Sequence, residues 1–292
     1  MKKRKKLGQY ILNAVFIAIV FAYLMPVITL ISCSLTDETT LLQNGYNLVP
    51  SKFSLEAYTL ALRRPMQMIR AYGVTIFFTA ASTLLSTLVV ALLAYPLSRP
   101  NFIWKRQLNF LVYFTMLFSG GMVPMYLLIT NVLHINNTIM VYILPGLVSA
   151  YNVMIVRTCY RGIPDELIES AKIDGAKELY ICFKIVIPLS KASIASVAFL
   201  FMVEKWNDWM TSTLYIRDQN LYSLQYLVQR LLREVNMLKN YAGAGVLTAG
   251  ETIPAETLRF AMALIAAGPV LVIFPFFQKY FTKGMTLGGV KG

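Results

Sequence analysis

The sequence predicts an all-α membrane protein that crosses the bilayer six times and forms a single domain over residues 1–292. Two observations carry this prediction. First, 57% of the 292 residues are hydrophobic and only 14% are charged, whereas roughly a quarter of the residues of a soluble domain are charged. Second, a helix needs about 20 apolar residues to cross a hydrocarbon core of roughly 30 Å, and six segments meet or approach this length. They are residues 7–34, 71–97, 108–133, 139–156, 190–210 and 260–277.

The first segment follows a run of basic residues and contains Pro26. Its apolar run is far longer than the roughly 7–15 apolar residues of a signal peptide, so we expect a retained span rather than a lipoprotein signal cleaved before Cys33. The second segment carries hydroxyl side chains four residues apart, which share one helix face. This stripe favours close helix packing, although the polar wall of a pathway would have the same pattern. Its members are Thr75, Thr79, Thr83 and Thr87.

Helix breakers lie inside the third and fourth segments. Ser119-Gly120-Gly121 precedes Pro124 in the third, and Pro145-Gly146 lies in the fourth. Such breaks persist in lipid only where neighbouring helices or a cavity satisfy the freed backbone groups, so they indicate either a bundle around a pathway or kinked helices. The fifth segment is the least clear, because Glu204 and Lys205 interrupt it early, whereas the second, third and sixth are clear.

Basic residues are distributed unevenly between the connecting segments. The two ends of the chain and the connections after the second and fourth segments hold 17 of the 27 Lys and Arg residues but only five of the 14 acidic residues. Because Lys and Arg concentrate on the cytoplasmic side, we expect both termini, residues 157–189 and the tail 278–292 in the cytoplasm, and residues 204–259 outside. The net charge of +13 therefore reflects membrane topology rather than a nucleic-acid-binding surface.

Several chemistries have no support in the sequence. The three cysteines show no paired spacing, and His134 is the only histidine. We therefore expect no disulfide framework, no metal site and no histidine-based catalytic triad. The sequence also lacks the Gly-x4-Gly-Lys-Ser/Thr pattern that cradles nucleotide phosphates, so the chain is expected to bind no cofactor and not to hydrolyse ATP itself.

Residues 157–189 form a polar, charged segment between two apolar spans. Ile163-Pro164-Asp165-Glu166 is typical of a helix start, with acids in the first turn. Gly175 is suited to the left-handed conformation that ends a helix, and a second helix is expected over Ala176–Val186, before Pro188. Two short helices around a glycine turn, with an apolar face, fit either the groove of a partner protein or a lipid surface. The residues alone leave both possibilities open.

A longer pattern in this segment resembles a known family. The string Glu169-Ser170-Ala171-x3-Gly175-x9-Ile185-x-Ile187-Pro188 is similar to the EAA loop of binding-protein-dependent ABC importer permeases, which normally reads Glu-Ala-Ala-x3-Gly-x9-Ile-x-Leu-Pro. Ser170 and Ile187 depart from that pattern, both conservatively in size. Further stretches resemble the carbohydrate-uptake branch, and within it importers of oligosaccharides and larger glycans such as alginate or pectin fragments. These stretches are Phe118–Pro124, Ile163–Asp165, Trp206–Trp209 and Lys283–Gly292.

The resemblance implies the type I ABC importer permease fold, with a cytoplasmic coupling helix. It also implies partners: a second, homologous permease subunit in a heterodimer, two ATPase subunits that bind ATP and Mg²⁺, and an extracytoplasmic solute-binding protein. The chain would be a multi-pass protein of a bacterial cytoplasmic membrane that moves glycans by alternating access. By match, ATPase coupling would involve Glu169, Ser170, Ala171, Asp174, Gly175, Ile185 and Pro188. A second ATPase contact would involve Lys283, Gly288, Gly289 and Lys291.

Polar and aromatic residues near the span ends are candidates for the substrate pathway, because intramembrane polar residues are functional by default. They are Tyr151, Asn152, Trp206, Asn207, Asp208 and Trp209. Aromatic faces and planar polar groups suit sugars, although Trp is also enriched at membrane interfaces. An apolar stripe in residues 204–259 predicts an external helix that packs on the bundle and receives the binding protein, or that serves the core alone.

An ion-coupled secondary transporter is the rival interpretation. It would require buried carboxylates at a coupling-ion site, and inverted repeats. The first four segments and the sixth contain no Asp or Glu in their apolar stretches, and we find no repeat. A membrane scaffold or channel subunit would have no need of the Glu169–Pro188 pattern.

Overall fold

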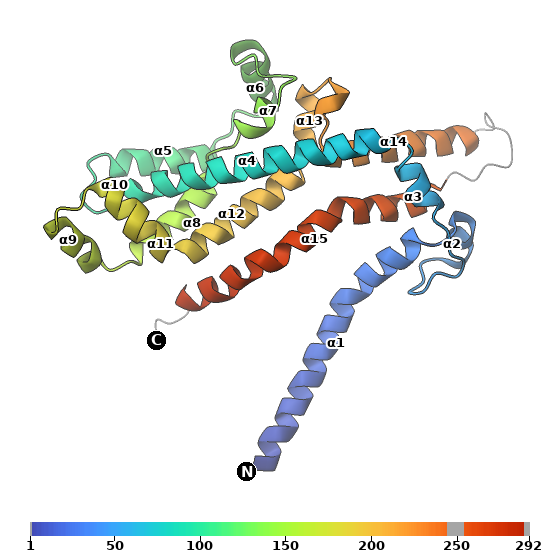
Figure 1. Cartoon of the computed structure of the whole chain (residues 1–292), viewed down its shortest axis with the longest axis horizontal. Helices are drawn as coiled ribbons and strands as arrows, with labels where there is room; N and C mark the ends of the chain where they lie inside the picture. The colour runs from blue at the N-terminus through green and yellow to red at the C-terminus, as the bar shows by residue number, and fades with distance from the viewer. Residues whose placement is uncertain (1, 244–253, 289–292) are drawn as a thin grey trace. The chain divides into compact units, whose positions relative to one another are not determined.

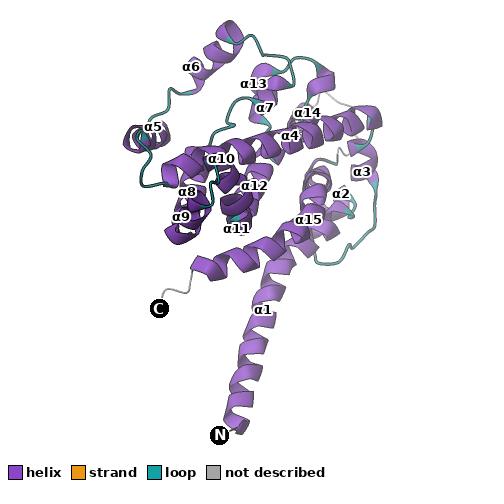
Figure 2. Ribbon diagram, turned by 60° about the vertical axis from the view of Figure 1, so that its left-hand side comes forward, coloured by secondary structure: helices purple, strands orange, loops and turns teal. Residues whose placement is uncertain are grey.

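The computed structural model describes residues 2–243 and 254–288, which fold into helices and loops with no strand in these two ranges. The helices are labelled in Figure 1, and Figure 2 shows them coloured by secondary structure. In chain order they are α1 (Lys2–Ser34), α2 (Glu38–Asn44), α3 (Glu56–Ala61), α4 (Pro65–Ser98), α5 (Lys105–Leu117), α6 (Met122–Leu127), the π-helix η1 (Leu128–Val132), α7 (Met140–Ile143), α8 (Ala150–Arg161), α9 (Asp165–Ile173), α10 (Glu178–Ile181), the π-helix η2 (Cys182–Val186), α11 (Ile187–Leu189), α12 (Lys191–Trp206), α13 (Met210–Tyr215), the 3-10 helix η3 (Gln219–Leu221), α14 (Leu224–Gly243) and α15 (Ala255–Gly288).

Residues 69–226 and 269–292 form one of two compact units, called unit 2 here. Within it, α4, α8 and α12 lie side by side in both views (Figures 1 and 2). The main core of unit 2 joins these helices to α5, α9, α10 and η2. On α8, buried side chains recur at Val153, Val156 and Tyr160, the three- and four-residue spacing of one helix face. The sequence pattern of α8 thus fixes which face turns to the core.

A second core of unit 2 lies nearer the start of α4. The rings of Phe78 on α4 and Tyr142 on α7 stack with centroids 4.3 Å apart. The Tyr142 hydroxyl donates a hydrogen bond to the Leu221 carbonyl at 2.7 Å and also bonds the Ser212 hydroxyl. Because a buried hydroxyl is costly unless it is paired, these bonds hold α7, α13 and η3 around the aromatic pair.

Residues 1–68 and 227–268 form the second compact unit, called unit 1. The carboxylate of Glu38, the first residue of α2, is buried and caps the start of α15. It accepts hydrogen bonds from the backbone N–H groups of Glu256 and Thr257 at 3.0 and 2.9 Å, and from the Thr257 hydroxyl at 2.8 Å. The first N–H groups of a helix have no partner within the helix, and negative charge is favourable at that end. Glu38 therefore stabilises unit 1 by joining two distant stretches of the chain.

Replacing Glu38 with alanine should lower the stability of unit 1. Loss of a capping side chain costs about 0.5–2 kcal/mol, and we expect the upper end because the freed N–H groups are buried. The measurement is the midpoint of thermal unfolding of the purified protein in detergent. Glu56→Ala is the matched control, since Glu56 is an exposed acid in the first turn of α3. Equal midpoints for the two variants would contradict the capping role.

Three helices are long and apolar enough to cross a membrane, judged by length and composition: Gly8–Ser34 of α1, Pro65–Ser98, and Ala255–Gln278 of α15. Two bent helix pairs raise the number to five if each pair is one span. In the first pair, α5 meets α6 and η1 at an angle of 109°, and in the second, α10 to α11 meet α12 at 81°. The prediction of an all-α membrane fold is confirmed.

The fourth predicted segment, residues 139–156, is divided between α7 and α8. Residues 144–149 between them are not helical. Pro145 has no N–H to donate to a helix, and Gly146 adopts φ = 79°, which glycine reaches without the penalty of a Cβ atom. The break that the sequence contains is therefore a true interruption of the helix rather than a mild kink.

Candidate functional site

The segment that matches the EAA pattern folds around a helix with a well-defined end. α9 begins directly after Pro164, and its first turn contains Asp165 and Glu166, the acids that suit a helix N-terminus. At its other end, the Gly175 N–H donates to the Lys172 carbonyl at 3.0 Å, and the Ala176 N–H donates to the Ala171 carbonyl at 2.9 Å. This pair of bonds is the Schellman arrangement. It requires the left-handed backbone that Gly175 adopts at φ = 81°.

The chain then returns toward the bundle through a continuous stretch of mixed helix. α10 passes into the π-helix η2 and the short α11, which contains Pro188 and ends before Ser190. The π-turn closes with the Ile187 N–H bonded to the Cys182 carbonyl, directly before Pro188, which has no N–H of its own. The axis then turns by 81° into α12. The second helix, predicted over Ala176–Val186, thus begins two residues later than predicted, at Glu178, and continues three residues further, as far as Leu189.

The residues of the EAA pattern lie on the outer surface of this segment. Glu169, Ser170, Asp174, Gly175 and Pro188 are exposed. Ala171 and Ile185 are half-buried. A hollow of about 580 Å³ lies between the end of α9 and the start of η2, with Ala171, Gly175 and Ile185 in its wall. The structure therefore brings residues from both halves of the pattern around one concave surface.

Three apolar side chains of this segment are exposed, and one of them, Tyr180, lines the hollow. Ile173 is 87% exposed, Leu179 is 70% exposed and Tyr180 is 57% exposed. Only Ile168, among the nine residues of α9, is buried. Clustered exposed apolar side chains mark surfaces that bind proteins or membranes, so the segment offers a docking surface with an acidic residue, Glu169, beside it.

Beneath this surface, two arginines connect the ends of α4 and α8. Arg99, which follows α4, donates to the Tyr160 carbonyl at 3.0 Å, and Arg157 of α8 donates to the Leu97 carbonyl at 3.1 Å. Both arginines are buried. Since the last carbonyls of a helix lack partners within it, each arginine satisfies the end of the other helix. The sequence identified these arginines only as topological charges and missed this role, which no local pattern signals.

Glu178, the first residue of α10, joins α9 to α4. Its carboxylate lies 2.6 Å from the Lys172 ammonium and accepts a hydrogen bond from the Tyr95 hydroxyl at 2.5 Å. The Lys172 ammonium, and after it the Tyr95 hydroxyl, hold the pKa of Glu178 below its usual range. The carboxylate is therefore ionised at neutral pH, and the contact weakens only as the pH falls through that lowered pKa.

The candidate pathway residues differ widely in exposure. Tyr151 is exposed at the start of α8. Asn152 is buried there, with its N–H bonded to the Ser149 hydroxyl. Trp206 is buried at the end of α12, while Trp209 is exposed. The three aromatic side chains among them therefore do not form one exposed surface.

The polar pair between those tryptophans bonds locally. The Asn207 amide donates to the Val203 carbonyl at 2.8 Å. The Asp208 carboxylate accepts from the Thr211 N–H and hydroxyl at 2.9 and 2.6 Å, at the start of α13. Both side chains thus stabilise the turn between α12 and α13, a role that the sequence did not indicate.

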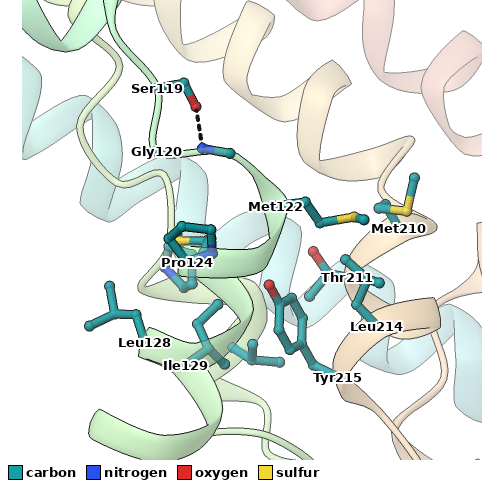
Figure 3. Close-up of a pocket in the computed structure, with 14 residues that line it drawn as sticks. Ser119, Gly120, Met122, Pro124, Leu128, Ile129, Met210, Thr211, Leu214 and Tyr215 are labelled. Atoms are coloured by element: carbon teal, nitrogen blue, oxygen red, sulfur yellow. Dashed lines mark hydrogen bonds between the residues drawn. The ribbon is translucent and has the colours of Figure 1, made fainter.

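A cavity of about 590 Å³ opens beside this turn. Residues of α6, η1 and α13 surround it, and most of its wall is apolar, as Figure 3 shows for Met122, Leu128 and Leu214. The extended loop Ser119–Gly121 closes one side, where the Gly121 N–H donates to the Ser119 hydroxyl at 3.2 Å. The break predicted between α5 and α6 thus lines a cavity, which is one of the two environments that tolerate such a break in a membrane.

Lys205, which interrupts the fifth predicted segment, is buried within unit 2. Its ammonium donates hydrogen bonds to the carbonyls of Tyr142 and Pro145, each at 3.1 Å. Those carbonyls lie at the break between α7 and α8, where no helical N–H reaches them. A Cβ atom at Gly146 would lie at ordinary contact distance from the ammonium, 3.7 Å, so this position requires glycine for its backbone conformation rather than for space. Lys205 therefore weakens the fifth predicted segment as a span but donates hydrogen bonds to the carbonyls at the break in the fourth.

The expected C-terminal contact falls partly outside the described residues. Lys283 and Gly288 lie in the last turns of α15. Gly289 and Lys291 lie beyond the residues that the structure describes.

Comparison with known proteins decides the family. Residues 86–287 match the family described as binding-protein-dependent transport system inner membrane component. The chain belongs to this family. As a permease, it is a non-enzymatic membrane subunit of an ABC importer, and it functions with a solute-binding protein and an ATPase. Across residues 2–243 and 254–288, no group of three or more His, Cys, Asp or Glu side chains could hold a metal ion.

Relatives cover almost the full length of the permease. It is 35% identical to the polygalacturonan/rhamnogalacturonan transport system permease protein YtcP of Bacillus subtilis (strain 168), over 96% of this chain and 99% of the relative. It is 28% identical to the arabinooligosaccharides transport system permease protein AraQ of Halalkalibacterium halodurans, over 100% and 99%. Among solved structures, a chain of a bacterial ABC transporter involved in the import of the acidic polysaccharide alginate has 27% identity and a TM-score of 0.77, over 95% of the permease and 98% of that chain. The predicted type I permease fold is confirmed.

Proposed function

We propose that this permease is one half of a heterodimeric channel that imports uronate-containing oligosaccharides by alternating access. Two features of its relatives support an acidic glycan: one is named for polygalacturonan and rhamnogalacturonan, and another belongs to an importer of the acidic polysaccharide alginate. The candidates for direct sugar contact remain Tyr151, Asn152, Trp206, Asn207, Asp208 and Trp209.

Two ATPase subunits drive this channel, and one of them docks on residues 163–188. The exposed apolar surface around the Schellman turn at Gly175 is the observation that carries this proposal. α9 projects from the core with one buried residue, so most of its surface is free for a partner. An amphipathic helix that enters a groove is a recurring mode of protein recognition. The lipid-surface alternative fits less well, because Glu169, Ser170 and Asp174 would enter the interface beside the apolar side chains.

In this proposal, the basic connecting segments lie in the cytoplasm, with both termini on the same side. The distribution of Lys and Arg between alternate connections supports that orientation. The tail at Lys283, Gly288, Gly289 and Lys291 is then on the ATPase side and provides a second contact.

Reversing the charge at Glu169 should uncouple the importer. The exposed carboxylate is positioned to pair with a basic residue of the ATPase, and loss of a hydrogen bond to a charged group costs about 1.5–3 kcal/mol, or roughly a ten- to hundredfold loss of affinity. We expect Glu169→Lys to reduce ATP-driven uptake of trigalacturonate by that factor in proteoliposomes that contain the complete importer and its binding protein.

Glu56→Lys is the matched control, because it reverses an exposed carboxylate on α3, outside residues 163–188. Wild-type uptake and wild-type retention of the ATPase by the Glu169→Lys permease would overturn the docking assignment. The substrate assignment has a separate test: uptake of neutral arabinotriose without uptake of trigalacturonate would show that the permease does not select acidic glycans.

A further inference from the structure

α9 is connected by polar contacts at both of its ends to the end of α4. At its first residue, the Asp165 carboxylate lies 3.5 Å from the guanidinium of Arg99, directly after α4. In its last turn, Lys172 pairs with Glu178, which accepts the hydrogen bond of Tyr95 in α4. A helix that is held at two points can neither rotate nor slide freely relative to the element that holds it.

The second of these connections lies between a cavity and the packed core that α4, α9, α10 and η2 share. A cavity of about 500 Å³ adjoins Tyr95, Lys172, Glu178 and Cys182. Atoms at the edge of a void have no packing partners on that side. The two contacts of the Glu178 carboxylate therefore hold this end of α9 to α4 at the edge of the core, on the side where packing is absent.

The last turn of α4 lacks one of its helix hydrogen bonds. Pro96 lies inside its last turn, and a proline in a helix removes the hydrogen bond to the residue four positions earlier, here Leu92. The two buried arginines then join this end to α8, because Arg99 bonds the Tyr160 carbonyl and Arg157 bonds the Leu97 carbonyl. A displacement that reaches Arg99 is passed to two helices of the bundle together.

We propose that Arg99 and Glu178 are positioning residues that fix both ends of α9 to α4, so that α4 receives the displacement when the ATPase moves α9. This inference rests on the proposed docking of the ATPase on residues 163–188. It goes beyond that proposal by assigning the path from the docking surface into the bundle to five polar side chains that lie outside the matched EAA positions: Tyr95, Arg99, Asp165, Lys172 and Glu178.

The test uses the complete importer in nanodiscs, with variants that weaken one polar contact at each end of α9, by loss of a hydroxyl donor or of a negative charge. Tyr95→Phe acts at the second connection and Asp165→Asn at the first. Neither empties the buried site of Arg99, whose loss could prevent folding. The reporter is Met210→Cys on α13, a half-exposed position at the cavity of Figure 3, in a background with Cys159→Ser. The measured quantity is the change in maleimide labelling rate when ATP and vanadate trap the ATPase.

We expect each variant to reduce this change by about fivefold, the factor for a hydrogen bond of ordinary net strength, while the ATPase subunits still co-purify. Tyr95→Phe combined with Glu178→Gln should be no worse than the more affected single variant, because the bonds from Lys172 to Glu178 and from Tyr95 to Glu178 act in series in one connection. Tyr95→Phe with Asp165→Asn should be additive. Tyr113→Phe, which removes an exposed hydroxyl on α5, is the control.

An unchanged reporter response in both single variants would overturn the inference. Loss of the ATPase from the Tyr95→Phe permease would overturn it too, because the contacts would then serve docking rather than transmission. The Glu169→Lys permease distinguishes failure of the docking proposal from failure of the path through α4. If it alone loses the response, docking stands and the path through α4 fails, whereas if it keeps the response, the docking proposal fails.

Discussion

A Lys205→Met permease should lose on the order of 3 kcal/mol of stability, because the Pro145 carbonyl would lose its donor and the Tyr142 carbonyl would keep only the 3.4 Å hydrogen bond from the Ser82 hydroxyl. Methionine keeps most of the side-chain volume, so the change removes the ammonium rather than the packing. We expect a lower midpoint of thermal unfolding in detergent and a smaller yield of folded protein. The effect should be large because Lys205 is itself buried and leaves no path for water to replace it.

Lys191→Met provides the matched control. It is the same substitution in the same helix, at the first residue of α12, where the side chain is exposed. Surface substitutions of this kind usually change stability by less than about 0.5 kcal/mol. If Lys205→Met were as stable as Lys191→Met, the break between α7 and α8 would have to be satisfied in another way, and the role of Lys205 given above would be wrong.

Substitutions at Gly175 should reduce transport most for the residues that least readily adopt a left-handed backbone conformation. Asparagine adopts that conformation most readily, other residues pay roughly 1–2 kcal/mol, and β-branched valine pays more. Proline is excluded, because its ring fixes φ near −65° and it lacks the N–H that bonds the Lys172 carbonyl. We expect trigalacturonate uptake to fall in the order Gly, Asn, Ala, Val, with none for Gly175→Pro.

The membrane bundle of these variants should remain folded, since Gly175 is exposed and a Cβ atom there would meet nothing within 4 Å. Gly73→Ala is the control: Gly73 lies within α4, where alanine also has space and favours the helix. Uptake that followed side-chain size at position 175, with asparagine worse than alanine, would show a steric clash with the partner instead of a backbone requirement.

Local signals in the sequence were sufficient for the elements around the docking surface. The acids after Pro164 and the glycine at position 175 mark the ends of α9, and the structure places both ends there. Apolar length identified α1, α4 and α15 in the same way. These features depend on neighbours along the chain, so a single sequence contains the information that determines them.

Contacts between segments that are distant in the chain could not be predicted from such local signals. Lys205 looked like an interruption of a span, because its partners lie some 60 residues earlier in a loop whose path is set by tertiary packing. Tyr95 and Glu178 are 83 residues apart, and neither stands out by pattern. A buried charge is explained only by the groups that surround it, and those groups are known once the helices have been placed together.

The cap at the start of α15 sets an order for assembly. The carboxylate of Glu38 has no partner until Thr257, 219 residues later, has been synthesised. The helices of unit 2 between residues 69 and 226 are complete before that point. Domains generally fold as units while the chain is being made, and closing long loops slows folding. The early helices of unit 1 are therefore synthesised long before the start of α15, which Glu38 caps. A chain cut short before residue 257 would contain the helices of unit 2 between residues 69 and 226, but it would lack the contact between Glu38 and Thr257 in unit 1.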